Sequence, residues 1–275
     1  MITYSVMSDV PRELVAYVTG LLRAERKNRG TRAGTRAPTR HGQAIFVLAW
    51  FRDRPDVTRL GRGFGVSQAT SYRYPGEGIE ILAAQASDLS FALERAKADG
   101  LPHLVLDGKV VDTDRLREKT TSRKGKEIDR WFAGKTRDFG GNTQAIFAPD
   151  GTPLWVSDVP PDGTHDITAA RRLVLETLQP YLRDLPVLAD PGYAGAGHGV
   201  HTPVKKRQDG FELDLNTRTY NKLLRALRRL GERGFALLTQ RWTTLQHVTL
   251  SPRRIGRIAR AALVLTQFEH KTIAG

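Results

Sequence analysis

The chain has 275 residues, no cysteine and a formal net charge of +14, from 43 Lys and Arg against 29 Asp and Glu. The missing cysteines exclude a disulfide framework and a thiolate metal site, and a hydrophobic content of 40% excludes a wholly disordered chain. The longest nearly continuous apolar run, residues 44–51, is too short to cross a bilayer, and residues 1–14 lack the pattern of a secretory signal, so we expect a cytoplasmic protein without a membrane partner.

The first part of the chain has the periodicity of helices. Helices are predicted over residues 11–22, 42–52, 77–86 and 88–98, and a linker rich in Gly, Thr and Arg separates the first two. Residues 23–40, around this linker, hold seven basic residues and one acid. Such clustering favours a nucleic-acid partner, because Lys and Arg neutralise phosphates.

Residues 57–74 have the pattern of a helix-turn-helix. A short helix over 57–64 is followed by a tight turn at Gly65 and a second short helix that Ser67 caps. The second helix of such a motif can enter the major groove. Its exposed readers would be Gln68, Ser71, Tyr72 and Arg73. Helix pairs joined by Gly also occur in all-α domains of other function, and Pro75 predicts an early end to the second helix.

After a break at residues 100–102 the pattern changes to strands. Strands are predicted over 104–106, 143–148, 154–159 and 186–189. A helix is predicted from Thr164, with Asp166 in its first turn, and long helices follow over 219–241 and from residue 251. Residues 205–260 hold 14 basic residues against four acids, which again favours nucleic acid.

Two aspartates stand where predicted strands end. Asp107 and Asp190 each follow an apolar strand and precede a Gly or Pro turn. If the strands are neighbours, the carboxylates converge at the edge where open α/β sheets bind ligands. Their repulsion favours a divalent cation between them, and with a third carboxylate such a site holds two metals for phosphoryl transfer. For either residue alone, an ordinary turn is the alternative.

Four segments carry a family resemblance: LVLDGKVVDTDR, FAGKTRDFGGNTQAIFAPDGTPLWVSDVPPDGTHDITAAR, VLADPGYAGAGHGVHTPVK and NKLLRALRRLGERGFALLTQRW. In this order they resemble the DDE transposases of bacterial insertion sequences that have an N-terminal helix-turn-helix and a Harbinger-like DDE endonuclease domain. The resemblance implies an α/β, RNase H-like fold, a mixed five-stranded sheet flanked by helices. It also implies an all-α DNA-binding domain over residues 1–99 and a catalytic domain over residues 100–275.

The resemblance further implies a metal-dependent triad of Asp107, Asp190 and Glu232. Two Mg²⁺ ions, with Mn²⁺ as a substitute, would be the cofactor. From the residues alone Glu232 would not be chosen, because it lies on a helix face with basic neighbours that could form a surface ion-pair lattice. The alternative to this lattice is a basic face on which these neighbours, Arg225, Arg228 and Arg229, contact DNA phosphates. Gly231 and Gly234 beside it suggest close approach of metal or DNA.

Two further residues are possible accessories. Asp166, in GTHDITAAR, is a rival for the second aspartate, although a first-turn acid is also favoured by the helix dipole. Lys135, in AGKTRDFGG, could contact a phosphate or simply be a surface lysine.

The implied function is that of a nucleoid-associated transposase, which binds terminal inverted repeats and cleaves and transfers DNA strands. Its partners would be double-stranded DNA and further copies of the chain, in a dimer or larger assembly. Two alternatives stay open. One is a catalytically inactive or domesticated transposase acting as a DNA-binding regulator, and the proline-rich segment at residues 160–163 leaves room for a degenerate copy. The other is an RNase H-type nuclease acting on RNA–DNA hybrids.

Overall fold

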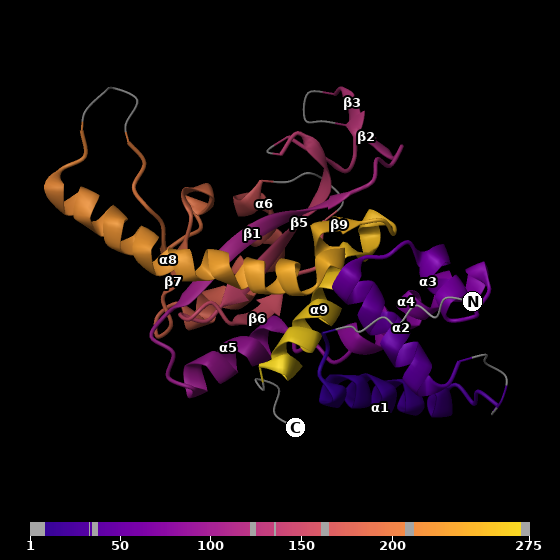
Figure 1. Cartoon of the computed structure of the whole chain (residues 1–275). Coiled ribbons are helices and arrows are strands. Elements are labelled where there is room, and N and C mark those ends of the chain that lie inside the picture. Colours follow the sequence, from indigo (N-terminus) through magenta and orange to yellow (C-terminus); the bar gives the residue numbers. More distant parts are fainter. Residues whose placement is uncertain are drawn as a thin grey trace. The chain divides into compact units, whose positions relative to one another are not determined.

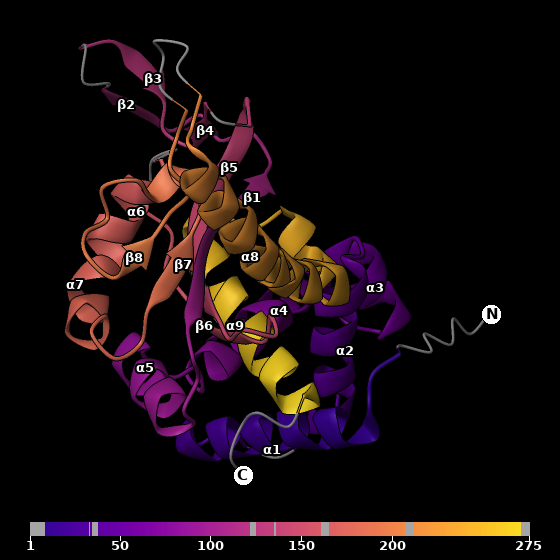
Figure 2. The same ribbon diagram turned by 90° about the vertical axis from the view of Figure 1, so that its left-hand side faces the viewer.

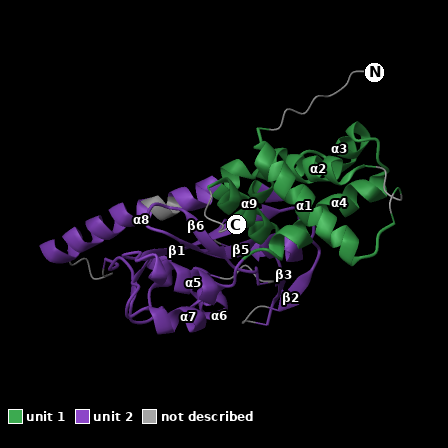
Figure 3. Cartoon of the chain, turned by 90° about the horizontal axis from the view of Figure 1, so that it is seen from below, with its two compact units in different colours: residues 1–86, 238–246, 257–275 green, residues 87–237, 247–256 purple. Residues whose placement is uncertain are grey.

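The computed structural model describes residues 9–32, 34, 38–121, 125–134, 136–160, 165–206 and 212–270, and only the backbone of residues 230–232. The chain forms two compact units (Figure 3). Unit 1 comprises residues 1–86, 238–246 and 257–275, and unit 2 comprises residues 87–237 and 247–256. The predicted division into a DNA-binding domain (1–99) and a catalytic domain (100–275) stays a prediction.

Figure 1 labels the helices and strands. The helices are α1 (Arg12–Asn28), α2 (Arg40–Asp53), α3 (Val57–Gly63), α4 (Gln68–Ala83), α5 (Leu89–Ala98), α6 (Asp166–Leu173), α7 (Leu175–Leu178), α8 (Leu215–Arg241) and α9 (Ile255–Glu269). The strands are β1 (Leu104–Thr113), β2 (Lys119–Thr121), β3 (Glu127–Asp129), β4 (Phe132–Ala133), β5 (Asp138–Phe147), β6 (Pro153–Val156), β7 (Val187–Ala189), β8 (Val200–His201) and β9 (His247–Val248). None of the helices in the described ranges combines the length and the apolar character that crossing a membrane requires.

Unit 1 is helical, and α3 and α4 lie where the helix-turn-helix is predicted. The turn between them contains Gly65 with a left-handed φ of 65°, which glycine adopts without strain. The Ser67 side chain caps α4 by accepting a hydrogen bond from the Thr70 amide. Phe46 of α2 packs edge-on against both Phe64 and Tyr74, which joins the pair to the core.

The predicted early end of the second helix at Pro75 is wrong, because α4 continues through it to Ala83. A proline inside a helix removes one backbone hydrogen bond and costs about 3 kcal/mol. Burial of the following turns offsets this cost. Ile79 and Leu82 are fully buried, and Gly78 lies so close to α2 that an added Cβ would be 2.5 Å from Val47.

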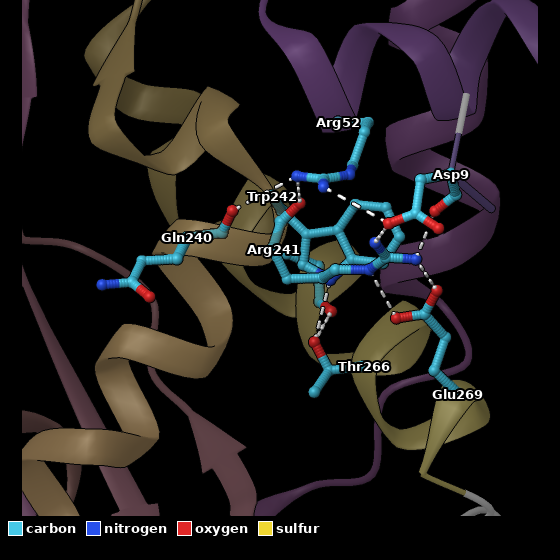
Figure 4. A network of polar contacts seen from close by, with 8 residues as sticks. Asp9, Arg52, Gln240, Arg241, Trp242, Thr266 and Glu269 are labelled. Carbon is cyan, nitrogen blue, oxygen red and sulfur yellow. Dashed lines mark hydrogen bonds and ion pairs between the residues drawn. The ribbon is translucent and has the colours of Figure 1, made fainter. Parts of the chain in front are cut away.

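A polar network holds the last turn of α8 within unit 1 (Figure 4). The Arg241 guanidinium donates two hydrogen bonds to Glu269, from Nε at 2.8 Å and from Nη2 at 2.5 Å. Its Nη2 also donates to the carbonyl of Asp9 at 2.6 Å, and Arg52 donates to the carbonyl of Arg241 at 3.1 Å. These contacts satisfy carbonyls and charges that the helix end would otherwise expose.

Unit 2 is built on a mixed sheet in the order β4-β5-β1-β7-β8. Strand β5 pairs antiparallel with both β1 and β6. In contrast, β7 pairs parallel with β1, and β8 pairs parallel with β7. Strand β9 adds parallel to the far end of β1. Helices flank this sheet, so the predicted α/β, RNase H-like fold is confirmed.

The two faces of the sheet carry different helices (Figure 2). Leu104 and Leu106 of β1 point to one face, where they share a core with buried residues of α5, α6 and α7. Alternate residues of a strand point to the opposite face. There Phe147 of β5 packs edge-on against Phe235 of α8, with ring centroids 5.1 Å apart. Gly234 permits this approach, since an added Cβ would be 2.2 Å from the Phe147 ring.

Candidate active site

Parallel pairing brings Asp107 and Asp190 to equivalent positions on neighbouring strands. The register of β1 with β7 pairs Leu104 with Val187 and Leu106 with Ala189. The next residue on each strand is the aspartate. The predicted convergence of these two acids at adjacent strands therefore has a structural basis in the register itself.

The predicted strand end at Asp107 is wrong, because β1 runs on to Thr113. Gly108 is consequently no turn residue. A Cβ at Gly108 would lie 2.6 Å from Gln144 Nε2, 2.7 Å from Asp166 Oδ1 and 2.8 Å from the Tyr193 hydroxyl. Glycine is needed there because polar side chains converge on the strand.

Asp190 does follow a strand end, as expected from the sequence. It is the N-cap of a short 3-10 helix, Pro191–Tyr193, and its Oδ1 accepts a hydrogen bond from the Gly192 amide at 2.7 Å. The fixed φ of Pro191 suits the first helical position. The turn holds the Asp190 carboxylate, and its last residue, Tyr193, is fully buried in the core.

The Asp107 carboxyl group has an unusual environment. Its side chain is only 16% exposed, and burial raises its pKa to about 6, against the opposing effects of Arg228 and the Gly108 amide. The negative charges of Asp190 and Asp166 add to the rise. A carboxyl group that is buried near other acids is a feature of functional sites.

A buried chain of hydrogen bonds connects the Asp190 turn to Asp166. The Tyr193 hydroxyl donates to Gln144 Oε1 at 2.7 Å, Gln144 Nε2 donates to Asn142 Oδ1 at 2.8 Å, and Asn142 Nδ2 donates to Asp166 Oδ1 at 2.8 Å. Burial, and then the charges of Asp166, Asp107 and Asp190, raise the pKa of Tyr193 well above its usual value. The Tyr193 side chain therefore stays a neutral phenol next to the acids.

Sequence reasoning missed Asn142 and Gln144. Both are buried, and they stand at alternate positions of β5, so their side chains share one face. Two amides in the middle of a buried strand are a signal in retrospect, because buried polar groups require partners. Those partners come from α6 and from the turn after β7, which are distant in sequence.

The structure places Asp166 beside Asp190, and the charge of Asp166 also raises the Asp107 pKa. It is the first residue of α6 and is only 6% exposed. An added Cβ on Gly192 would lie 2.7 Å from Asp190 Oδ1 and 3.3 Å from Asp166 Oδ2. Asp166 is therefore a neighbour of Asp190, where the sequence offered it as a rival.

The basic residues of α8 divide into two groups. Arg228 points inward, with its side chain 11% exposed and its Nη2 4.0 Å from Asp107 Oδ1, whereas Arg225 and Arg229 are exposed.

Glu232 lies in the same helix, but its side chain is outside the described residues. Gly234 serves the packing of α8 on β5, so the suggestion that metal or DNA requires this glycine is replaced by a structural reason. Lys135 also lies outside the described residues.

In unit 1 the candidate DNA-reading residues are not all exposed. Gln68, Tyr72 and Arg73 are exposed on α4. The expected exposure of Ser71 is wrong. It is fully buried, its hydroxyl donates to the carbonyl of Ser67 at 3.0 Å, and a Cβ on Gly61 of α3 would collide with it. Ser71 is the contact point of α3 and α4, which removes it from the possible readers.

The residue types at the site suit a hard divalent cation. Asp107, Asp190 and Asp166 offer oxygen ligands only, as Mg²⁺ and Mn²⁺ prefer, and the charges of Asp190 and Asp166 both raise the pKa of Asp107. Within the described side chains, no three His, Asp or Glu groups are already gathered at metal-binding spacing.

The sheet order, the helices on both faces and the acids on two neighbouring parallel strands define an RNase H-like protein. A comparison with protein families matches residues 106–267, more than half of the chain, to the family described as DDE superfamily endonuclease. The chain belongs to this family. Membership implies DNA as the substrate and phosphoryl transfer as the chemistry, and enzymes of the family typically use divalent metals. Comparisons with curated proteins and with solved structures found no match.

Proposed function

We propose that the protein is the transposase of an insertion sequence, which binds the inverted repeats at the ends of its element and catalyses strand cleavage and strand transfer. The observation that carries the proposal is the register of β1 and β7, which sets Asp107 and Asp190 side by side in a DDE endonuclease chain. The net charge of +14 and the α3–α4 pair support DNA as the partner.

Asp107, Asp190 and Glu232 would hold two Mg²⁺ ions, or Mn²⁺ in their place. When bound, the ions would supply an activated oxygen nucleophile and stabilisation of the leaving 3′ oxygen. Asp166 would add an oxygen at the same place. Arg228 offsets part of the negative charge at Asp107 before any cation binds.

Other parts of the chain would hold the DNA. The exposed residues Gln68, Tyr72 and Arg73 of α4 would contact base edges in the element ends. Arg225 and Arg229 of α8 would contact phosphates, and Lys135 is a further candidate for a phosphate contact. A dimer or larger assembly would join two DNA ends, with residues 1–99 as the binding domain and residues 100–275 as the catalytic domain.

Asp107→Asn tests this function. The variant should lose Mg²⁺-dependent cleavage of a duplex that carries the element end, while duplex binding in a gel-shift assay stays within about twofold of the wild type. Asp99→Asn, an exposed acid in the same unit, is the matched control and should cleave normally. Cleavage by Asp107→Asn at the wild-type rate would exclude the assigned role.

An inactive or domesticated transposase that regulates a promoter is the second candidate. The α3–α4 pair and the net charge of +14 support it as well as they support the transposase. This candidate predicts sequence-dependent duplex binding without Mn²⁺ binding and without cleavage by the wild-type chain. Metal-dependent cleavage by the wild type would eliminate it.

A further inference from the structure

The first half of α8 carries a stripe of cations that the site itself does not use. Arg218, Lys222, Arg225 and Arg229 are all exposed and recur at positions i, i+4, i+7 and i+11. On an α-helix this spacing aligns side chains along one face. No acid occurs between residues 215 and 229, and the one acid of α8, Glu232, follows three residues after the end of the stripe.

The stripe is separate from the buried face of the same helix. Asn221 and Leu224 are 4% and 5% exposed, and Arg228 turns inward to Asp107. Figure 1 shows the first turns of α8 extending beyond the strands, and of residues 215–220 all but the half-buried Thr217 are exposed. The cations are therefore presented outward while their neighbour at position 228 reaches the acids.

Among the described side chains, Lys222, Arg225 and Arg229 have no acidic partner within 4.0 Å, whereas Arg218 lies 3.9 Å from Glu212. Like charges on one helix face repel, and a polyanion bound along this face would relieve that repulsion. The other flank of α8 exposes Leu223 and Leu227 without adding charge. The cation row itself is thus suited to phosphates.

The dimensions also fit a nucleic-acid strand. Eleven residues of helix rise about 16 Å, and successive phosphates of one DNA strand are about 3.4 Å apart along the axis. The stripe could therefore face about five phosphates. Its inner end, Arg225 and Arg229, lies one turn or less from Arg228, which is 4.0 Å from Asp107.

We propose that Arg218, Lys222, Arg225 and Arg229 form a phosphate-binding ridge that holds the backbone of duplex DNA and leads it toward Asp107. The proposal rests on the proposed function, and it extends that function by naming the path of the DNA on unit 2. Arg228 is excluded from the ridge, because its guanidinium is engaged at the acid cluster.

The salt dependence of binding tests the ridge directly. Each phosphate contact lowers the slope of log K against log salt by about 0.9 for duplex DNA. The triple variant Lys222→Gln, Arg225→Gln, Arg229→Gln should therefore flatten the slope by about 2.7, measured on the full chain by fluorescence anisotropy with a 30-base-pair duplex of random sequence. Arg218 stays unchanged, since Glu212 already shares its charge. Circular dichroism and the thermal midpoint establish that α8 is folded in the variant.

The matched control is Arg117→Gln, Arg137→Gln, Arg183→Gln, which removes the same charge from exposed positions elsewhere in unit 2 that, among the described side chains, likewise have no acidic partner within 4.0 Å. Its slope should equal that of the wild type. Equal flattening by both variants would reduce the ridge to a general charge effect and overturn the proposal, as would a wild-type slope in the α8 variant. Tighter binding of single-stranded RNA than of duplex DNA by the wild type, abolished in the α8 variant, would overturn the assignment to duplex DNA.

The two proposals fail separately. Binding through the ridge by a wild-type chain that never cleaves DNA would refute the transposase and leave the ridge standing. Metal-dependent cleavage by the wild type, with an unchanged salt slope in the α8 variant, would refute the ridge and leave the transposase standing.

Discussion

The guanidinium of Arg228 lies 4.0 Å from the carboxylate of Asp107, across the interval between helix α8 and strand β1. Both side chains are largely buried, at 11% and 16% exposed. Arg228 lowers the pKa of an acid that burial and two neighbouring aspartates raise. The α8 helix therefore contributes to the acid site through a residue whose side chain is described, independently of Glu232.

Replacing Arg228 should shift the pH dependence of cleavage. In Arg228→Met the Asp107 pKa should rise above its present value of about 6, because the opposing positive charge is gone. Asp107 binds a cation only when ionised, so the acidic limb of the rate profile should move to higher pH. Activity should fall severalfold near pH 6 and recover near pH 9. Arg225→Met removes the same charge from an exposed position and should leave the limb in place.

Asp107→Asn should change how stability depends on pH. The folded-state pKa of about 6 exceeds the ordinary 3.8, so protonation of Asp107 contributes stability that is fully present below pH 3.8. That contribution is lost as pH rises through about 6. A shift of this size corresponds to about 3 kcal/mol. Urea unfolding in EDTA should show Asp107→Asn gaining about this much relative to the wild type between pH 4 and pH 7.

The control for this comparison is Asp99→Asn, an exposed acid whose difference from the wild type should stay nearly constant over the same range. An Asp107→Asn difference that is equally flat would contradict the burial and charge argument for Asp107.

Gly108→Ala should disrupt the site. The added Cβ would meet Gln144, Asp166 and Tyr193 at 2.6 to 2.8 Å, and overpacking of this kind costs about 1 to 3 kcal/mol. Gly20→Ala in α1, where an added Cβ meets nothing within 4 Å, should instead be stabilising by up to about 1 kcal/mol. Thermal or urea unfolding measures both, and a Gly108→Ala chain as stable as the wild type would show that the three side chains have room to yield.

Asn142→Leu should weaken both stability and cation binding. The change removes the hydrogen bond to Asp166 and the acceptor of Gln144, at a cost of about 1 to 3 kcal/mol. Loss of a group that orients a ligand typically lowers metal affinity about tenfold or more. Mn²⁺ titration followed by electron paramagnetic resonance measures this. The control, Thr113→Val, alters a buried hydroxyl farther along β1 and should keep the wild-type affinity.

Local sequence patterns were sufficient for part of this site. The apolar runs before Asp107 and Asp190 predicted two buried strands, but whether these strands are neighbours was left open, and the structure pairs them in parallel. Helical periodicity found α8, but it placed Arg228 with its exposed neighbours, because spacing alone does not tell which side of a basic helix faces a sheet. The packing of Phe147 on Phe235 decides that rotation.

The remaining features depend on contacts between distant segments. Ser71 is buried because it packs directly against Gly61 of another helix, which has no Cβ to keep it away. The amides of Asn142 and Gln144 acquire their meaning from Tyr193 and Asp166, which lie in other elements. Such partnerships have no periodicity in the sequence, so no pattern within one segment predicts them.

Direct measurement of Mn²⁺ binding tests the central claim, that Asp190 and Glu232 act together with Asp107 on divalent cations. The wild-type chain should bind Mn²⁺ in an electron paramagnetic resonance titration, and Asp190→Asn and Glu232→Gln should each weaken binding by at least about tenfold, while Asp99→Asn should not. Wild-type affinity in both of the first two variants, or no Mn²⁺ binding by the wild type, would contradict the account.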